Sequence, residues 1–413
     1  MTSTSSSPDR SVPRSLRKAG DHSRDGRGRV IATPAILQYG FRPFFLLAGL
    51  HAGLAVPSWS WAYLGGMEIA GPFGGMNWHA HEMLFGYVGA VIAGFILTAI
   101  PNWTGRLPLS GGPLAVLVAL WLVGRIACLL APDPWLALVA DLAFPCVLTF
   151  AIWREVMAGR NWKNAPVAVM ITLFGAANLL DHIGNMGLID AQLGRRLASA
   201  VIAMLLALIG GRIVPSFTRN WLAKLDAGSL PSSFGVPDKA ALAATATALA
   251  AWIVVPESTE AGVALCIAGS LLAVRLSRWR GAAALREPIL LVLHIGYGWL
   301  ACALFLLGLA IFVPTLPASA ALHALTAGAV GTMTLAVMTR ASLGHTGRAI
   351  VADGYVVAMY ALVTLGALLR VVAPLAGDHH AVALGAGGVL WSSAFMLFVI
   401  RYAPILCRPR LGA

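Results

Sequence analysis

Long apolar runs separated by short polar connections dominate this chain. Twelve runs of about 20 apolar residues are each long enough to cross a bilayer as a helix. They begin near Ala35, Trp78, Gly112, Pro134, Ala165, Leu197, Lys239, Ala261, Pro288, Ala318, Gly354 and Ala381. The longest polar connection covers residues 218–238, which leaves no room for a separate soluble domain. The pattern predicts an all-α, polytopic membrane helix bundle that forms a single domain over residues 31–413.

The first 30 residues differ from the rest of the chain. They are rich in Ser and Arg and contain no apolar core, so they match neither a signal peptide nor a membrane span. We predict that residues 1–30 are a disordered, basic, cytoplasmic tail.

Composition and charge agree with a membrane location. Apolar residues make up 58% of the chain and charged residues 11%, whereas soluble domains carry about 25% charged residues. The net charge of +12 suggests nucleic acid as a partner until the basic residues are placed on the predicted topology. With the tail inside, 24 of the 29 basic residues fall on the cytoplasmic side, which is the positive-inside rule with both termini cytoplasmic. The charge therefore reflects topology, the partner is the lipid bilayer, and nucleic acid is excluded.

An internal repeat links the second and tenth predicted spans. Residues 81–106 and 323–348 align without gaps over 26 positions. The matching positions are His81/His323, Gly86/Gly328, Gly89/Gly331 and Thr104-Gly105-Arg106/Thr346-Gly347-Arg348. The sixth span ends in a weaker version, Gly210-Gly211-Arg212. Because these spans are four apart, the pattern predicts internal four-helix repeats, and we interpret the Thr-Gly-Arg turns as helix caps rather than ligand sites.

Four histidines lie at one depth, in the outer third of the membrane. They are His79, His81, His182 and His323. Ionisable groups inside a bilayer are costly and usually functional, so we predict that these four bind metal. His51 and His294 are further metal candidates, with an interhelical hydrogen bond as the alternative for each. The five cysteines are widely spaced, and we interpret them as core residues.

The His79-Ala80-His81 spacing predicts two sites. Residues two apart on a helix point about 200° apart, so the two imidazoles face opposite sides. Glu82 is expected on the face of His79. In the fifth span a polar stripe is typical of a metal second shell or a proton path. It consists of Asn178, Asp181, His182 and Asn185.

Two arginines, Arg125 and Arg370, lie in the outer halves of their spans, where basic residues are unusual. They are predicted to contact a cofactor. Their charge is neutralised either by a carboxylate such as Asp133 or Asp141 or by haem propionates, and the sequence leaves this choice open.

Several motifs resemble a known family. They are Tyr39-Gly40-Phe41-Arg42-Pro43-Phe44-Phe45, Trp78-His79-Ala80-His81-Glu82-Met83-Leu84-Phe85-Gly86, Thr98-Ala99-Ile100-Pro101-Asn102-Trp103-Thr104-Gly105-Arg106, Gly210-Gly211-Arg212-Ile213-Val214-Pro215-Ser216-Phe217-Thr218 and Gly344-His345-Thr346-Gly347-Arg348. Together they resemble the NnrS family of haem- and copper-binding bacterial inner-membrane proteins over about residues 35–405. The resemblance implies twelve helices, haem (we expect b-type), copper and the relief of nitric oxide stress. It also implies an architecture similar to the catalytic subunit of haem–copper oxidases.

From the residues and the resemblance together we expect a haem between His81 and His323, and a second metal centre at His79. His182, His51 and His294 are the additional copper candidates. Nitric oxide would enter from the lipid and be reduced to nitrous oxide, with electrons from a quinol or a cytochrome and protons carried by Glu82 and Asp181. The alternative is a non-catalytic protein that binds or senses nitric oxide. A transporter is disfavoured because the repeated spans run in the same direction.

Overall fold

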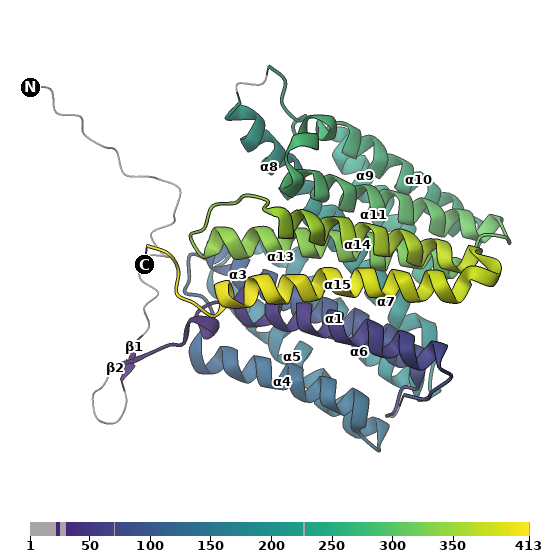
Figure 1. Ribbon diagram of the computed structural model, residues 1–413, viewed down its shortest axis with the longest axis horizontal. Coiled ribbons are helices and arrows are strands. Elements are labelled where there is room, and N and C mark those ends of the chain that lie inside the picture. The colour runs from purple at the N-terminus through teal and green to yellow at the C-terminus, as the bar shows by residue number, and fades with distance from the viewer. Residues whose placement is uncertain (1–21, 25–29, 70, 226–227, 413) are drawn as a thin grey trace, which may run out of the picture.

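The computed structural model describes residues 22–24, 30–69, 71–225 and 228–412. Within these ranges the chain forms twelve long helices, one at each predicted apolar run (Figure 1). Nine of them are uninterrupted: α1 (Phe41–Leu64), α4 (Gly111–Leu130), α5 (Pro134–Ala158), α6 (Ala165–Asn185), α9 (Val236–Val254), α10 (Thr259–Ser277), α11 (Pro288–Phe312), α14 (Gly354–Val372) and α15 (His380–Leu406). The all-α prediction is confirmed.

The other three long helices each contain a π-helical segment. In the first, α2 (Gly75–His81) continues through the π segment Glu82–Val88 into α3 (Gly89–Thr104). In the second, α7 (Ala191–Leu205) continues through Leu206–Gly210 into α8 (Gly211–Ala223). In the third, α12 (Ala318–His323) continues through Ala324–Val330 into α13 (Gly331–His345). We call these three the composite helices.

Short elements complete the described chain. Five 3-10 turns cover Ala35–Leu37, Trp162–Asn164, Gly281–Arg286, Ala373–Leu375 and Gly377–His379. Strands β1 (His22–Arg24) and β2 (Val30–Ala32) pair antiparallel, with Ser23 opposite Ile31. Apart from these strand residues, the predicted tail over residues 1–30 lies outside the described residues.

Ten of the twelve helices are long and apolar enough to cross a membrane, so this is a multi-pass membrane protein. The helices α1 and α9 were also predicted as spans but fall outside that set of ten. The first and third composite helices are the most deeply buried of the ten, with 72% of their most apolar windows inside the bundle.

The two repeated segments have the same local structure. Their π segments, Glu82–Val88 and Ala324–Val330, are separated by the same 242 residues as His81 and His323. A glycine in the left-handed region follows each helix, Gly105 directly after α3 with φ 71° and Gly347 two residues after α13 with φ 75°, a backbone conformation that glycine adopts without strain. The interpretation of the Thr-Gly-Arg turns as helix caps is confirmed. The larger four-helix repeat and the likeness to oxidases stay predictions.

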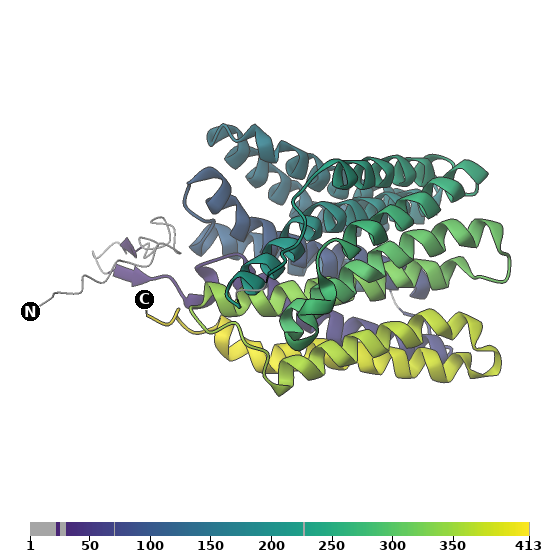
Figure 2. The ribbon, with the colours of Figure 1, turned by 90° about the horizontal axis from the view of Figure 1, so that it is seen from above.

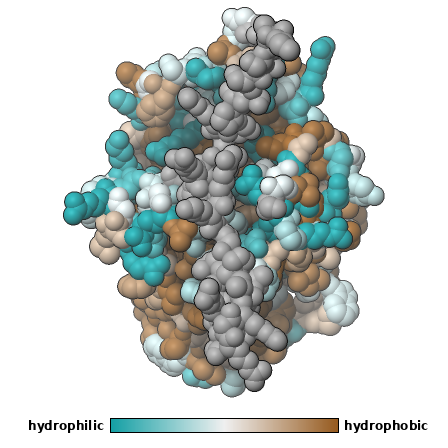
Figure 3. All heavy atoms as spheres, turned by 90° about the vertical axis from the view of Figure 1, so that its left-hand side faces the viewer, coloured by the Kyte–Doolittle hydropathy of each residue, from teal (hydrophilic) through white to brown (hydrophobic). Residues whose placement is uncertain are grey.

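The two ends of the bundle differ in character. Both views show the described N- and C-terminal segments at the same end, which we call the tail end (Figures 1 and 2). Hydrophilic residues gather on that face (Figure 3). Because the helices alternate in direction, the far end carries the starts of α2, α5 and α12 and the ends of α4 and α6. Four of the predicted histidine ligands, His79, His81, His182 and His323, lie near this far end.

Candidate metal centre

His81 lies at the junction of α2 and its π segment, and its side chain is fully buried. Its Nδ1 atom is 2.8 Å from Asp181 Oδ2 on α6, and its Nε2 atom is 3.1 Å from Asp141 Oδ2 on α5. The thiol of Cys128, near the end of α4, lies 3.5 Å from the same Nε2. Three other helices thus bring polar side chains to the imidazole of His81.

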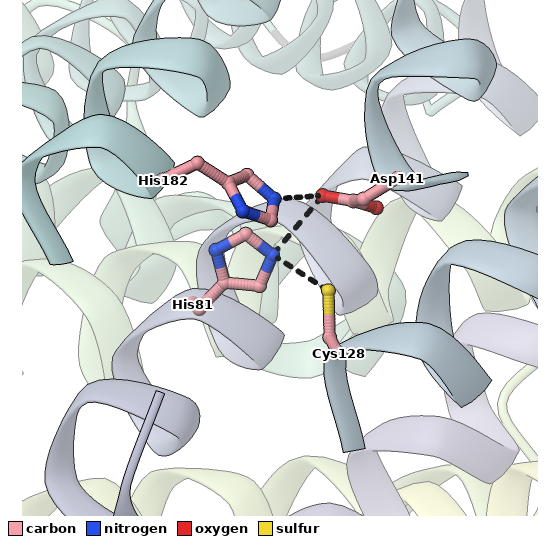
Figure 4. A group of neighbouring side chains, drawn as sticks. All are labelled: His81, Cys128, Asp141 and His182. Atoms are coloured by element: carbon pink, nitrogen blue, oxygen red, sulfur yellow. Dashed lines mark hydrogen bonds and ion pairs between the residues drawn. The ribbon is translucent and has the colours of Figure 1, made fainter. Parts of the chain in front are cut away.

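Four of these residues form what we call the metal-capable group: His81, Cys128, Asp141 and His182 (Figure 4). Each offers one ligand atom, all of these atoms lie within 4.8 Å of one another, and all four residues are buried. The Nε2 atom of His182 is 3.2 Å from Asp141 Oδ2. Two imidazoles, a thiol and a carboxylate at this spacing are donors for a transition metal ion.

Asp141 is the centre of the polar network. Its Oδ2 also accepts a hydrogen bond from Asn178 Nδ2 at 2.9 Å, and its Oδ1 accepts from Arg125. Arg125 also donates to Glu82 Oε1 at 2.8 Å. A buried charge is tolerated only when it is paired and hydrogen-bonded. The structure therefore decides the open question for Arg125 in favour of protein carboxylates, whereas Asp133 caps α5 instead.

His51 reaches this network through Glu82. Its Nε2 atom is 2.9 Å from Glu82 Oε2, and its ring contacts Trp121 edge-on. The space for these groups exists because residue 86 is glycine. A Cβ atom there would lie 2.8 Å from Glu82 Oε2, 2.8 Å from His51 Nε2 and 2.9 Å from an Arg125 nitrogen. His51 therefore neighbours the metal-capable group without belonging to it.

Asp181 connects the group to the far end. Its Oδ1 accepts a hydrogen bond from Arg195 Nε at 2.9 Å, and Arg195 Nη2 donates to Asn185 Oδ1 at 3.1 Å. The Asp181 side chain is fully buried, whereas Arg195 is 12% exposed. One end of the polar stripe predicted on this helix thus contacts His81. The other end reaches the partly exposed Arg195.

A second histidine group lies on the opposite face of α2. The His79 ring stacks on Trp59 with centroids 4.1 Å apart, and it lies close enough to His323 and Arg370 for electrostatic interactions. The Nδ1 atom of His79 is buried without a hydrogen-bond partner, while Nδ1 of His323 hydrogen-bonds to Ser319 O at 2.6 Å. Among the described residues, Arg370 has no carboxylate partner. We call His79, His323 and Arg370 the second histidine group.

Three expectations need correction. The pairing of His81 with His323 is wrong, because His81 contacts Asp181 and Asp141, whereas His323 on α12 is close enough to His79, on the opposite face of α2, for an electrostatic interaction. Glu82 was expected beside His79, but the π segment begins at Glu82 and its wider turn places this carboxylate beside Arg125. His294 joins neither group: it lies near the tail end of α11, with Nδ1 3.0 Å from Leu290 O. The opposite orientation of His79 and His81 is as predicted.

Cys128 was missed as a candidate ligand, and Asp141 was considered only as a partner of Arg125. A single cysteine in an apolar run carries no motif. One signal was present: Arg125 and Cys128 are three residues apart and share a face of α4. A buried arginine one turn from the thiol marked that face as polar.

The comparison with protein families gives one match. The family model described as NnrS protein matches residues 35–410. None of the curated proteins matches the chain.

Proposed function

The chain belongs to the NnrS family, and from this we propose that it is a haem- and copper-dependent inner-membrane protein that detoxifies nitric oxide by reducing it to nitrous oxide. The observation that carries the proposal is the metal-capable group, a buried set of two imidazoles, a thiol and a carboxylate. Nitric oxide is small and apolar, so a reaction centre inside a bilayer is accessible to it without a polar channel.

Copper fits the donors of the metal-capable group. A thiolate together with two imidazoles is a donor set typical of copper sites. With Asp181 accepting a hydrogen bond from Nδ1 of His81, the Nε2 atom that faces Asp141 and Cys128 is the one that would bind a metal, as in the carboxylate–histidine pairs of many metal sites. Bound there, copper would supply a redox-active centre for the gas. His81, Cys128 and His182 would hold it, and Asp141 would balance its charge.

Haem fits the second histidine group. Nδ1 of His323 hydrogen-bonds to the Ser319 carbonyl, which leaves Nε2 of His323 as the possible ligand atom. His79 has a buried ring nitrogen, Nδ1, without a hydrogen-bond partner. Two histidines are a common pair of axial haem ligands, and an arginine without a carboxylate suits a propionate. His79, His323 and Arg370 would therefore hold the haem, whose chemistry is the delivery of single electrons.

Reduction of two nitric oxide molecules consumes two electrons and two protons and yields nitrous oxide and water. The electrons would come from a quinol or a cytochrome. With both termini in the cytoplasm of a bacterium, the far end would face the periplasm, and Asp181, held by Arg195, would carry protons from that side. Glu82, which lies between His51 and Arg125, would hold a proton on the other side of the group.

The test uses the purified protein, kept anaerobic and supplied with a chemical reductant and nitric oxide. We expect consumption of nitric oxide at an electrode and evolution of half as many molecules of nitrous oxide by gas chromatography. Cys128→Ser should abolish turnover and lose copper. The matched control Cys146→Ser changes an exposed cysteine of α5 and should retain both.

The competing function is tight binding of nitric oxide without turnover, as in a sensor or scavenger. It is supported by the ion pairs of Arg125 with Asp141 and Glu82, which neutralise these buried charges within the protein. Spectra that show stable nitric oxide binding without nitrous oxide would favour this function. A preparation with neither haem nor copper would overturn both and leave transport as the remaining class.

A further inference from the structure

An apolar cavity of about 80 Å³ lies where the three composite helices meet. Its walls come from α3, from α7 and α8 with their π segment, and from α13, Ile171 of α6 adds to the lining, and the cavity is partly open. Representative lining residues are Val91, Ile202 and Met333. Each π segment contributes its last residue to the wall, namely Val88, Gly210 and Val330. Such segments are rare and recur at functional sites, and here three of them end at one cavity.

The lining offers water nothing to bind. Of the 16 lining residues only Thr334 has a polar side chain. Its hydroxyl already donates to Val330 O at 2.7 Å and contacts the hydroxyl of Tyr87. A buried water needs two to four polar partners, whereas apolar cavities stay dry and take up apolar molecules such as xenon. Since a water molecule occupies about 30 Å³, the volume suits one or two molecules of a small gas.

Two aromatic rings link the cavity lining to the metal-capable group. Phe85 lies one turn beyond His81, with ring centroids 5.1 Å apart, and it packs on Phe174 of α6 at 5.3 Å. Phe174 is in turn one helical turn from Ile171, which lines the cavity. A route along these contacts from the cavity to His81 crosses two phenylalanine rings and no charged side chain.

We propose that this cavity binds a small apolar gas and delivers it to the metal-capable group past Phe85 and Phe174. That the gas is nitric oxide rests on the proposed function. The affinity of the cavity for an apolar atom of similar size does not, because it follows from the lining alone. The two parts of the proposal can therefore be measured separately.

The first measurement is the binding of xenon to the intact purified protein, located in xenon-pressurised crystals. We expect a xenon atom among Val91, Ile202 and Met333. Ile202→Phe should fill the cavity and remove that xenon, whereas Ile202→Ala should enlarge the cavity and raise its occupancy. Ile267→Phe, the same change at a residue of α10 that is 51% exposed, should leave the xenon in place. An empty cavity in the unaltered protein overturns the proposal.

The second measurement is the rate of nitric oxide association with the reduced metal-loaded protein, followed by stopped-flow absorbance. We expect Ile202→Phe to slow association several-fold with little change in the final spectrum, and Ile267→Phe to match the unaltered protein. If Ile202→Phe fails to fold, Val91→Phe fills the same space from α3. Xenon binding with unchanged association rates overturns delivery to the metal. If the unaltered protein binds no nitric oxide, the proposed function is overturned. The xenon measurement then tests the gas site by itself.

Discussion

His81 and Asp181 meet with Nδ1 and a carboxylate oxygen 2.8 Å apart, and both side chains are fully buried. The contact fixes which nitrogen of His81 faces Asp141, Cys128 and His182. A carboxylate in this position usually orients a metal-binding histidine and increases its basicity. The relationship gives Asp181 a positioning role, which is one of the two roles that the polar stripe of its helix predicted.

Asp181→Asn should weaken metal binding while leaving the donors of the metal-capable group in place. Loss of such an outer partner typically costs roughly 10- to 100-fold in metal affinity. Copper affinity can be measured by competition with a chelator of known affinity. The control is Asp190→Asn, which changes the cap of α7 at the same end of the bundle. Equal affinities for both variants and the unaltered protein would contradict the positioning role.

Gly86→Ala should destabilise the protein, because the new methyl group would overlap Glu82, His51 and Arg125. Overpacking of this kind costs about 1–3 kcal/mol. Thermal unfolding in detergent, followed by tryptophan fluorescence, measures the loss. Gly175→Ala on α6 is the matched control, since its Cβ would be 3.6 Å from Pro145, an ordinary contact. A Gly86 variant as stable as this control would argue against the close packing around Glu82.

Arg125→Met should be strongly destabilising, because it leaves Asp141 and Glu82 buried without their cation. Removing one partner of a buried ion pair costs about 3–5 kcal/mol. The double variant Arg125→Met with Glu82→Gln should recover part of the loss, because one of the two unpaired charges is removed. Arg154→Met, at a residue 54% exposed, should unfold like the unaltered protein. No recovery in the double variant would contradict the pairing.

The two histidine groups should lose different cofactors. His79→Ala and His323→Ala should lose haem, measured by the pyridine haemochrome spectrum, and should retain copper by elemental analysis. His81→Ala and His182→Ala should show the reverse, because their imidazoles lie on the other face of α2. The same loss from all four variants would contradict a separation into two sites.

Much of the fold follows from the apolar runs, because a bilayer requires each crossing to be a helix of about 20 residues. The opposite orientation of His79 and His81 follows from helix geometry alone. The repeat also predicted local structure, since its two copies have π segments of the same length and left-handed glycines at equivalent positions. These features depend on one helix at a time.

What the sequence did not predict depends on which helices are neighbours. Equivalent positions in a repeat, such as His81 and His323, are related by the fold and need not face each other. Cys128 carries no spacing pattern, and it becomes a candidate ligand only when α4 packs beside α2 and α5. The position of Glu82 depends on a π segment, which helical periodicity does not anticipate.

The single residue between His79 and His81 has a mechanical consequence. A lateral shift of α2 that brings His79 closer to His323 would carry His81 away from Asp141, because the two imidazoles point in opposite directions from the same helix. Tightening either site therefore strains the other, and by thermodynamic linkage the influence is reciprocal. We therefore expect occupancy on one side of the helix to affect binding on the other side.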